Sequence, residues 1–198
     1  MPASKYHREN LRATLLELAE ATVRSSGVES LSLRQLARDA GVSHAAPARH
    51  FRDRQALLDA LAFDGFERLN AMMSDAAGSE GSFETRFRAL ATAYVDFAVE
   101  NAALLGLMYI AKHAEGASDA LIAAGRRSMD LAVSLVAAAQ AAGQVIPGDS
   151  GRIALVVFAS VHGVASLATD ELLDGMSVED ATAATVELLL RAITVTPR

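Results

Sequence analysis

Residues 31–51 of the chain read LSLRQLARDAGVSHAAPARHF, and this stretch decides the fold of its N-terminal part. Its Ser32-Leu33-Arg34-Gln35 string has the spacing of a capping box, in which the serine hydroxyl accepts the glutamine amide and the glutamine side chain reaches back. A short helix is therefore predicted from Leu33 to about Asp39. Gly41 supplies the left-handed turn that stops it. A second short helix is predicted from Ser43 to about His50, and Phe51 then enters the core.

Two short helices that meet across a glycine turn have the length and turn chemistry of a helix-turn-helix. The second helix of such a motif is thin enough to enter the major groove of DNA. A plain helical hairpin is the alternative, because short capped helices with a glycine turn occur in many folds. Pro47 has no amide hydrogen, so the second helix is expected to lose its first internal hydrogen bond and to start loosely.

Helical periodicity continues beyond this stretch, and the only prolines are at positions 2, 47, 147 and 197. An all-α protein is predicted. The expected helices cover residues 6–26, 54–73, 83–100, 102–113, 118–142, 150–173 and 178–193. Ser118, Asp149 or Ser150, and Ser177 are the expected caps. Residues 1–54 would form the helix-turn-helix domain, joined by one continuous helix to a second helical domain of residues 55–198.

Charge is distributed unevenly along the 198 residues, whose formal net charge is -6. Residues 1–54 hold nine basic and six acidic side chains, whereas the rest holds nine basic and eighteen acidic ones. A basic module on an acidic body suggests that the module meets an anionic partner. The polar N-terminus does not have the pattern of a secretory signal. The apolar run Ile153–Ala168 is shorter than a membrane span, so it is interpreted as a buried helix, with no membrane partner and a cytoplasmic location expected.

Enzyme and metal chemistry find little support in the residues. There is no cysteine and no phosphate-binding Gly-x-x-x-x-Gly-Lys string, so thiol catalysis, iron-sulfur clusters and nucleotide hydrolysis are not expected. The Gly148-Asp149-Ser150-Gly151 string is better explained as a loop with a helix cap than as a serine nucleophile. A metal site of His113, Glu115 and His162 is less favoured than a polar lining of a ligand cavity. No enzyme, cofactor or metal is predicted.

The stretch from Leu31 to Ser43, continued by Arg49-His50-Phe51, resembles the TetR family of transcriptional regulators, and the likeness spans about residues 8–65. The resemblance implies a homodimer whose N-terminal domains bind two half-sites in double-stranded DNA. It also implies a C-terminal helical domain for dimerisation and for sensing a small-molecule effector. Val161-His162-Gly163 resembles the Trp-His-Gly string of one C-terminal subclass, with valine in place of tryptophan. Ala48 stands where the family usually has a tyrosine that contacts a phosphate.

The resemblance and the chemistry of the side chains together nominate contacts to DNA. Arg49 and His44 are candidates for base edges or nearby phosphates, and the alanines beside them favour contacts with thymine methyl groups. The alternatives are a solvated helix face for Arg34 and Arg38 and a packed core position for His50. The predicted DNA-binding residues are Arg34, Gln35, Ser43, His44, Ala45, Arg49 and Arg54.

The second domain is expected to hold an effector pocket and a dimer interface. Soft and aromatic side chains often line adaptable apolar pockets, although most such residues are simply core. The predicted ligand-binding residues are Phe87, Tyr94, Met108, Tyr109, His113, Met129, Phe158 and His162. The predicted interface residues, from the last two helices, are Ile153, Val157, Val161, Val164, Val186 and Leu190. A ligand-responsive repressor is thus the leading hypothesis, and a helical homo-oligomeric interaction protein without specific DNA binding is the alternative.

Overall fold

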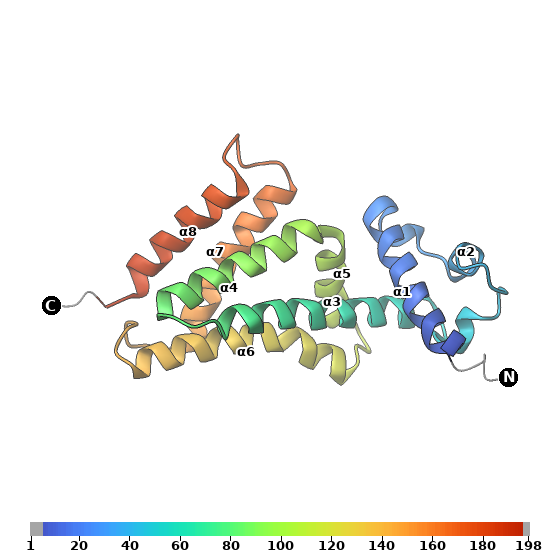
Figure 1. Ribbon diagram of the computed structural model, residues 1–198, viewed down its shortest axis with the longest axis horizontal. Helices are drawn as coiled ribbons and strands as arrows, with labels where there is room; N and C mark the ends of the chain where they lie inside the picture. Colours follow the sequence, from blue (N-terminus) through green and yellow to red (C-terminus); the bar gives the residue numbers. More distant parts are fainter. Residues whose placement is uncertain (1–5, 196–198) are drawn as a thin grey trace. The chain divides into compact units, whose positions relative to one another are not determined.

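A computed structural model describes the backbone of residues 6–195 and the side chains of residues 11–195, and it is helical as predicted (Figure 1). Eight α-helices and two 3₁₀ turns account for the regular structure of this part, and a single bridge between Val145 and Thr194 is its only β pairing. The elements are α1 (Tyr6–Ser26), η1 (Val28–Ser30), α2 (Leu33–Asp39), η2 (Pro47–Arg49), α3 (Arg54–Ala77), α4 (Phe83–Glu100), α5 (Ala102–Lys112), α6 (Asp119–Ala141), α7 (Ser150–Thr169) and α8 (Val178–Ile193).

The chain divides into two compact units. Unit 1 holds the residues up to Phe66 together with Asn101–Gly125, and unit 2 holds Glu67–Glu100 together with the residues from Arg126 onward. Helix α3 supplies residues to both units, because it runs without a break from Arg54 to Ala77. Helix α5 and the first residues of α6 also belong to unit 1, so α6 too supplies residues to both units.

The core of unit 1 is formed where α1, α2, α3 and α5 bury their apolar sides. Leu15 of α1, Leu36 of α2 and Leu57 of α3 are all almost inaccessible to solvent. Helices α3 and α5 approach closely at Gly65, where an added Cβ would lie 2.7 Å from the Met108 sulfur. A residue larger than glycine would therefore force Met108, which is fully buried, to move.

The predicted helix caps are confirmed at three helix starts. Ser118 accepts the amide of Leu121 before α6, and Ser177 accepts the amide of Asp180 before α8. Before α7 the cap is Asp149, whose carboxylate accepts the amides of Gly151 and Arg152. The Gly148–Gly151 string is thus a loop that ends in a helix cap. These side chains satisfy amides that have no partner within the helix.

Unit 2 is built around the mutual packing of α4, α7 and α8, and α7 is not the buried helix that its composition predicted. Only 22% of its most apolar 18-residue window is buried, although the helix is long and apolar enough by composition to cross a bilayer. The prediction was wrong because apolar residues surround α7 on all sides, while only one side packs against α4 and α8. Leu155 and Val156 consequently stay 56% and 60% exposed.

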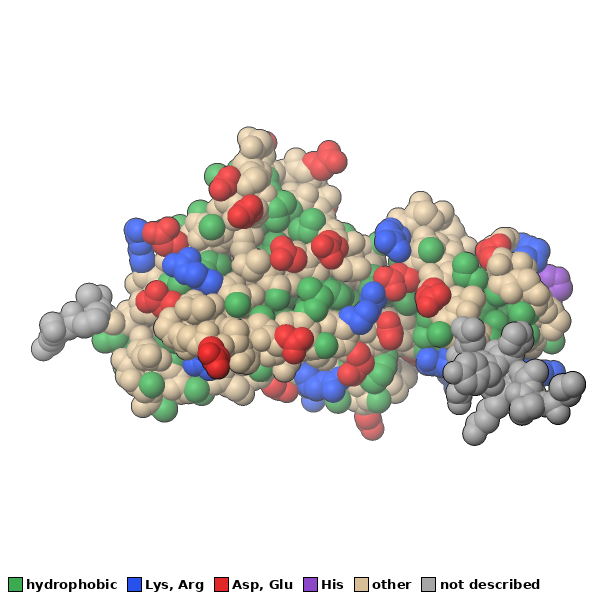
Figure 2. Space-filling model, in the orientation of Figure 1, with side chains coloured by type: hydrophobic (Ala, Val, Ile, Leu, Met, Phe, Trp, Pro, Cys, Tyr) green, Lys and Arg blue, Asp and Glu red, His purple; other side chains and the backbone are tan. Residues whose placement is uncertain are grey.

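The surface of the described residues mixes charge signs. Figure 2 shows acidic, basic and apolar side chains interspersed on the face that it draws. Among the described side chains, no three histidine, aspartate or glutamate residues form a group that could hold a metal ion.

Candidate functional site

The turn after α2 has the geometry that the sequence predicts. Gly41 adopts a φ of +67°, and its amide donates to the carbonyl of Arg38. The amide of Val42 donates to the carbonyl of Ala37 at 2.9 Å, which completes a Schellman motif. A β-carbon is disfavoured at this φ, so glycine is what allows α2 to stop here and the chain to turn.

The capping box predicted at the start of α2 is absent. Ser32 makes no side-chain cap hydrogen bond. The Gln35 side chain instead points along the helix, where its amide donates to Asp39 at 2.6 Å and its carbonyl oxygen accepts from Arg38. The charged partners three and four residues ahead hold the glutamine more strongly than the neutral backbone amide behind it.

The second helix of the motif is shorter than predicted and is not α-helical. The amide of Ala46 donates to Ser43 at 2.9 Å, and the amide of Arg49 donates to Ala46 at 3.2 Å. The segment Ser43–Arg49 therefore consists of two successive three-residue turns, the second of which is η2. Pro47 explains the difference, because it has no amide to donate to the carbonyl of Ser43 and its ring is fully buried.

The start of α3 fixes the other side of the motif. The Asp53 carboxylate accepts the amide of Ala56 at 2.8 Å, and this hydrogen bond is the main reason that the pKa of Asp53 lies below its usual value. Arg54 donates to two backbone oxygens, those of Leu31 at 3.1 Å and Val28 at 2.6 Å. In this structure Arg54 thus ties α3 to the connection between α1 and α2.

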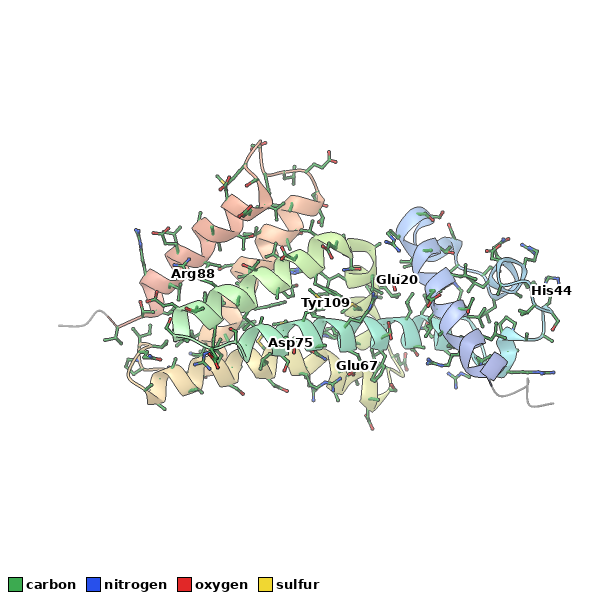
Figure 3. All side chains as sticks on the ribbon, in the orientation of Figure 1. Glu20, His44, Glu67, Asp75, Arg88 and Tyr109 are labelled. Atoms are coloured by element: carbon green, nitrogen blue, oxygen red, sulfur yellow. The ribbon has the colours of Figure 1, made fainter. Side chains whose placement is uncertain are left out.

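Most of the predicted DNA-binding side chains point into solvent on unit 1. Arg34, Ser43, His44, Ala45 and Arg49 are exposed, and Figure 3 shows His44 projecting from the outer edge of the unit. Gln35 is exposed but engaged with Arg38 and Asp39, and Arg54 is partly buried against the backbone. His50 is half-buried, and Phe51 is in the core with the guanidinium of Arg12 5.4 Å from its ring centre.

Two family models match the chain. Residues 15–61, which include the whole turn motif, match the model described as bacterial regulatory proteins of the tetR family. Residues 87–193 match the model described as the tetracyclin repressor-like C-terminal domain. The chain belongs to the TetR family of transcriptional regulators. The motif of α2 and Ser43–Arg49 is accordingly the helix-turn-helix of this TetR-family regulator.

Solved structures share this fold over nearly the full chain. A protein of unknown function from Rhodococcus sp. RHA1 is 52% identical with a TM-score of 0.91, over 97% of this chain and all of that one. The TetR-family regulator PfmR from Thermus thermophilus is 20% identical with a TM-score of 0.73, over 89% of this chain and 97% of that one. SmeT, the repressor of the Stenotrophomonas maltophilia multidrug efflux pump SmeDEF, is 21% identical with a TM-score of 0.72, over 93% and 90%. A search of curated proteins found no match.

Three of the eight predicted ligand-binding residues meet in unit 2 of the regulator. A hydrogen bond of 2.7 Å joins the Tyr94 hydroxyl to Nδ1 of His162. Phe158 stacks on His162 with ring centres 5.5 Å apart, and it meets Tyr94 edge to face at the same distance. Tyr94 is buried, whereas His162 and Phe158 are half-buried, so this cluster combines an apolar body with a hydrogen-bonding edge.

The other five predicted ligand-binding residues lie elsewhere. Phe87 is buried against Phe83, and Met108 is buried beside Gly65 in unit 1. Tyr109 packs edge to face on Phe66 in unit 1. The remaining two are Met129, which is half-buried on α6, and His113, which is exposed and donates from Nδ1 to the carbonyl of Tyr109.

The predicted dimer-interface residues divide by burial. Ile153 and Val157 are half-exposed on α7. The other four, Val161, Val164, Val186 and Leu190, are buried inside the protomer. The apolar face that α7 and α8 leave open is made by different residues, namely Leu155, Val156, Ala159, Leu167, Ala184, Leu188 and Ala192.

Two features of the sites went unnoticed in the sequence. On α8 the open face was detectable from the spacing of Ala184, Leu188 and Ala192 by four residues, which is the signature of one helix side, and its α7 residues lie within the apolar run noted in the sequence. The contact of Arg54 with the backbone of residues 28–31 carries no local signal, because the partners are main-chain oxygens more than twenty positions away.

Proposed function

We propose that this regulator is a ligand-responsive repressor that binds a pseudo-palindromic operator as a homodimer and is released by a small apolar effector. The observation that carries the proposal is the segment Ser43–Arg49, which follows α2 across the Gly41 turn within the matched helix-turn-helix domain and exposes its side chains except those of Ala46 and Pro47. An outward segment of this kind fits the major groove, where sequence is read.

The exposed side chains of unit 1 divide by role in this proposal. His44 and Arg49 extend from the two ends of the segment and are placed at base edges or nearby phosphates. Arg34 and Ser43 contact phosphates, which position the module without reading sequence. Gln35 contacts a phosphate only if its hydrogen bond to Asp39 breaks. Arg54 stabilises the motif and does not contact DNA, because its guanidinium already donates to the carbonyls of Val28 and Leu31.

The homodimer is supported by the open apolar face of α7 and α8. Members of the TetR family act as dimers, and in this chain the two helices pack together with α4 against them. Figure 1 shows α7, α8 and α4 side by side. Leu155, Val156 and Leu188 are each more than half exposed, which is unusual for a single patch on a protomer. Pairing this face with its copy gives a four-helix interface.

The effector site is placed at the cluster of Tyr94, Phe158 and His162. The rings of Tyr94 and Phe158 offer apolar contact, and the Tyr94 hydroxyl with the His162 imidazole offers one polar anchor. This combination suits a small and mostly apolar molecule. Helices α3 and α6 both contribute to the two units, and α3 directly follows the helix-turn-helix, so we take α3 as the element through which binding in unit 2 affects unit 1. A coupling of about 1–3 kcal/mol, or roughly 5- to 150-fold in operator affinity, is sufficient for regulation.

Two finer assignments accompany the proposal. The resemblance of Val161-His162-Gly163 to the Trp-His-Gly string suggests that subclass, in which His162 would be a site residue. Regulators of this family are soluble proteins of the cytoplasm, and we assign this chain to the same compartment.

Selection from random double-stranded DNA, followed by sequencing, tests the proposal. The purified protein is expected to enrich a pseudo-palindrome and to bind it with an affinity that falls steeply as salt rises, because phosphate contacts release counterions. A library of apolar metabolites is then screened by thermal shift, and each stabilising compound is added to the operator-binding assay. At least one is expected to weaken binding, and less so in His162→Phe.

Failure to enrich any sequence, with binding equal on all DNA, would favour the alternative of a helical interaction protein. Enrichment without any compound that changes affinity would leave a constitutive DNA binder. His113→Ala is the matched control for His162→Phe, because His113 is exposed and belongs to unit 1.

A further inference from the structure

We propose that the segment Ser43–Arg49 reads thymine through the methyl groups of Ala45 and Ala48. Each operator half-site would then depend on the 5-methyl groups of two thymines in the major groove. This inference rests on the proposed DNA binding and specifies which bases the helix-turn-helix selects.

The backbone places the two alanines in equivalent positions. The hydrogen bond from Ala46 to Ser43 closes one three-residue turn, and the hydrogen bond from Arg49 to Ala46 closes the next. Ala45 and Ala48 are the last residues enclosed by these two turns. Each alanine therefore has the same place within its own turn, and both alanines are exposed.

Pro47 creates this arrangement. The missing amide prevents the α-helical bond to the carbonyl of Ser43, and two separate three-residue turns take its place. The proline ring is fully buried and Ala46 is half-buried, so the middle of the segment exposes only Ala45 and Ala48. The exposed polar side chains, Ser43, His44 and Arg49, lie at its two ends.

The chemistry of a methyl group decides what it recognises. A guanine, adenine or cytosine edge carries donors or acceptors that would lose water against an alanine and gain no hydrogen bond. Thymine presents its own methyl group in the major groove, so contact with alanine removes apolar surface from water on both sides. At position 48 the family usually has a tyrosine that contacts a phosphate, whereas alanine has no group that reaches one. The shorter side chain lets the backbone approach the bases instead.

The setting of the two alanines points to DNA as their ligand. The cationic Arg49 directly follows Ala48 and is exposed, and residues 15–61 match the tetR-family DNA-binding model. The segment is therefore a methyl surface between polar ends inside a domain already assigned to DNA.

Replacement of single thymines by deoxyuridine in the enriched operator tests the inference. Deoxyuridine keeps the hydrogen-bonding edge and lacks only the methyl group, so any loss of affinity reports that group alone. We expect about 3- to 10-fold weaker binding at two thymines in each half-site and no change at the others. Affinities are measured by fluorescence anisotropy at one fixed salt concentration, because salt changes them all.

Matched variants assign each methyl contact to its alanine. Ala48→Gly is expected to abolish the thymine–deoxyuridine difference at one position, and Ala45→Gly at the other. Ala46→Gly, at the half-buried alanine between them, is expected to leave both differences intact. Circular dichroism and the melting temperature show whether Ala48→Gly loosens the turn. If it does, Ala48→Ser replaces it as the test variant, because serine is close to alanine in size and adds only a hydroxyl.

The outcomes separate this inference from the function on which it rests. Specific, salt-sensitive binding that is unchanged by deoxyuridine at every position overturns the methyl readout and leaves the regulator in place. Deoxyuridine effects that persist in Ala45→Gly and Ala48→Gly overturn the assignment to these residues. A protein that enriches no sequence at all contradicts the DNA-binding function itself.

Discussion

Arg49 is the residue on which operator affinity depends most directly. It is exposed at the end of the segment that follows the Gly41 turn, and its side chain is long enough to reach a base edge or a phosphate. Arg49→Ala is expected to weaken operator binding about 10- to 100-fold. Anisotropy titration measures this loss, and Arg88→Ala is the control, because Arg88 is an exposed arginine of α4 in unit 2 (Figure 3). Equal binding by Arg49→Ala and wild type would remove Arg49 from the interface.

Arg54 is expected to stabilise the fold of unit 1 and not to contact DNA directly. Its guanidinium donates to the carbonyls of Val28 and Leu31, and Arg54→Ala would leave both oxygens without this donor. The free energy of unfolding is expected to fall by about 1–3 kcal/mol in urea denaturation. Arg54→Lys keeps the charge but not the two-pronged geometry, so it should recover only part of the loss. An unchanged free energy of unfolding in Arg54→Ala would mean that these hydrogen bonds do not stabilise the fold. Arg54 would then be a candidate for phosphate contact, as the sequence predicts.

Residue roles were only partly predictable from sequence, and Gln35 illustrates why. Its spacing from Ser32 matches a capping box, yet its amide binds Asp39 and its oxygen binds Arg38. Several neighbours compete for one flexible side chain, and a spacing rule identifies only one of them. Phe51, by contrast, was predicted correctly as core because its burial follows from the pattern of the whole motif.

At the scale of elements, the start of α3 depends on the Asp53 cap. Asp53→Ala is expected to lower the melting temperature at neutral pH, because the amide of Ala56 loses its acceptor. The folded state lowers the pKa of Asp53, so the charged cap stabilises the fold above the pKa of the unfolded chain. That contribution disappears as pH falls through the lowered pKa, below about pH 4.

The difference in melting temperature between wild type and Asp53→Ala should therefore shrink in acid. Asp53→Asn is the control, since asparagine caps helices well but does not titrate in this range. It is expected to keep most of the stability and to lose this part of the acid dependence. A deficit in Asp53→Ala that stays constant from pH 7 to pH 3 would show that the charge of the cap is irrelevant.

The crossing of α3 and α5 makes a second prediction at this scale. Gly65→Ala is expected to cost about 1–3 kcal/mol in urea denaturation, because its Cβ would lie 2.7 Å from the sulfur of the buried Met108. Gly106→Ala is the matched control, for nothing lies within 4 Å of its added Cβ. This control should stabilise α5 by up to about 1 kcal/mol. Equal stabilisation by both substitutions would show that Met108 moves aside freely.

Helix boundaries were largely predictable, and the exceptions have local causes. The periodicity and the caps predicted α1, α4 and α8 with the bounds that the structure shows. The segment after Gly41 differed because one proline replaced α-helical bonding by three-residue turns. Helix α7 differed in burial, since composition alone does not distinguish a helix covered by its own chain from one with an open side.

At the scale of the whole molecule, the open face of α7 and α8 is expected to hold the dimer together. Leu188 is 67% exposed in the protomer, and Leu188→Glu would place two unpaired carboxylates in a symmetric interface. Dimerisation should weaken by roughly 100-fold or more, as measured by sedimentation at micromolar concentration.

Ile110→Glu tests whether the loss of dimerisation is specific to the open face of α7 and α8. Ile110 is 72% exposed on α5, so this variant introduces the same charge at a similarly exposed apolar position of unit 1, whereas α7 and α8 belong to unit 2. It should remain dimeric. Val164→Glu, at a buried position, should instead unfold the protomer. Loss of the dimer in Ile110→Glu but not in Leu188→Glu would place the interface elsewhere.

The most direct test of the central claim is the affinity of the purified protein for its enriched operator when one half-site is scrambled and the other is kept. Two linked helix-turn-helix modules that each read a half-site predict a loss of at least about 100-fold, together with a log–log salt slope roughly half that of the intact site. Equal affinity and equal slope for the intact and the half-scrambled DNA would contradict a dimeric regulator that reads a two-fold symmetric operator.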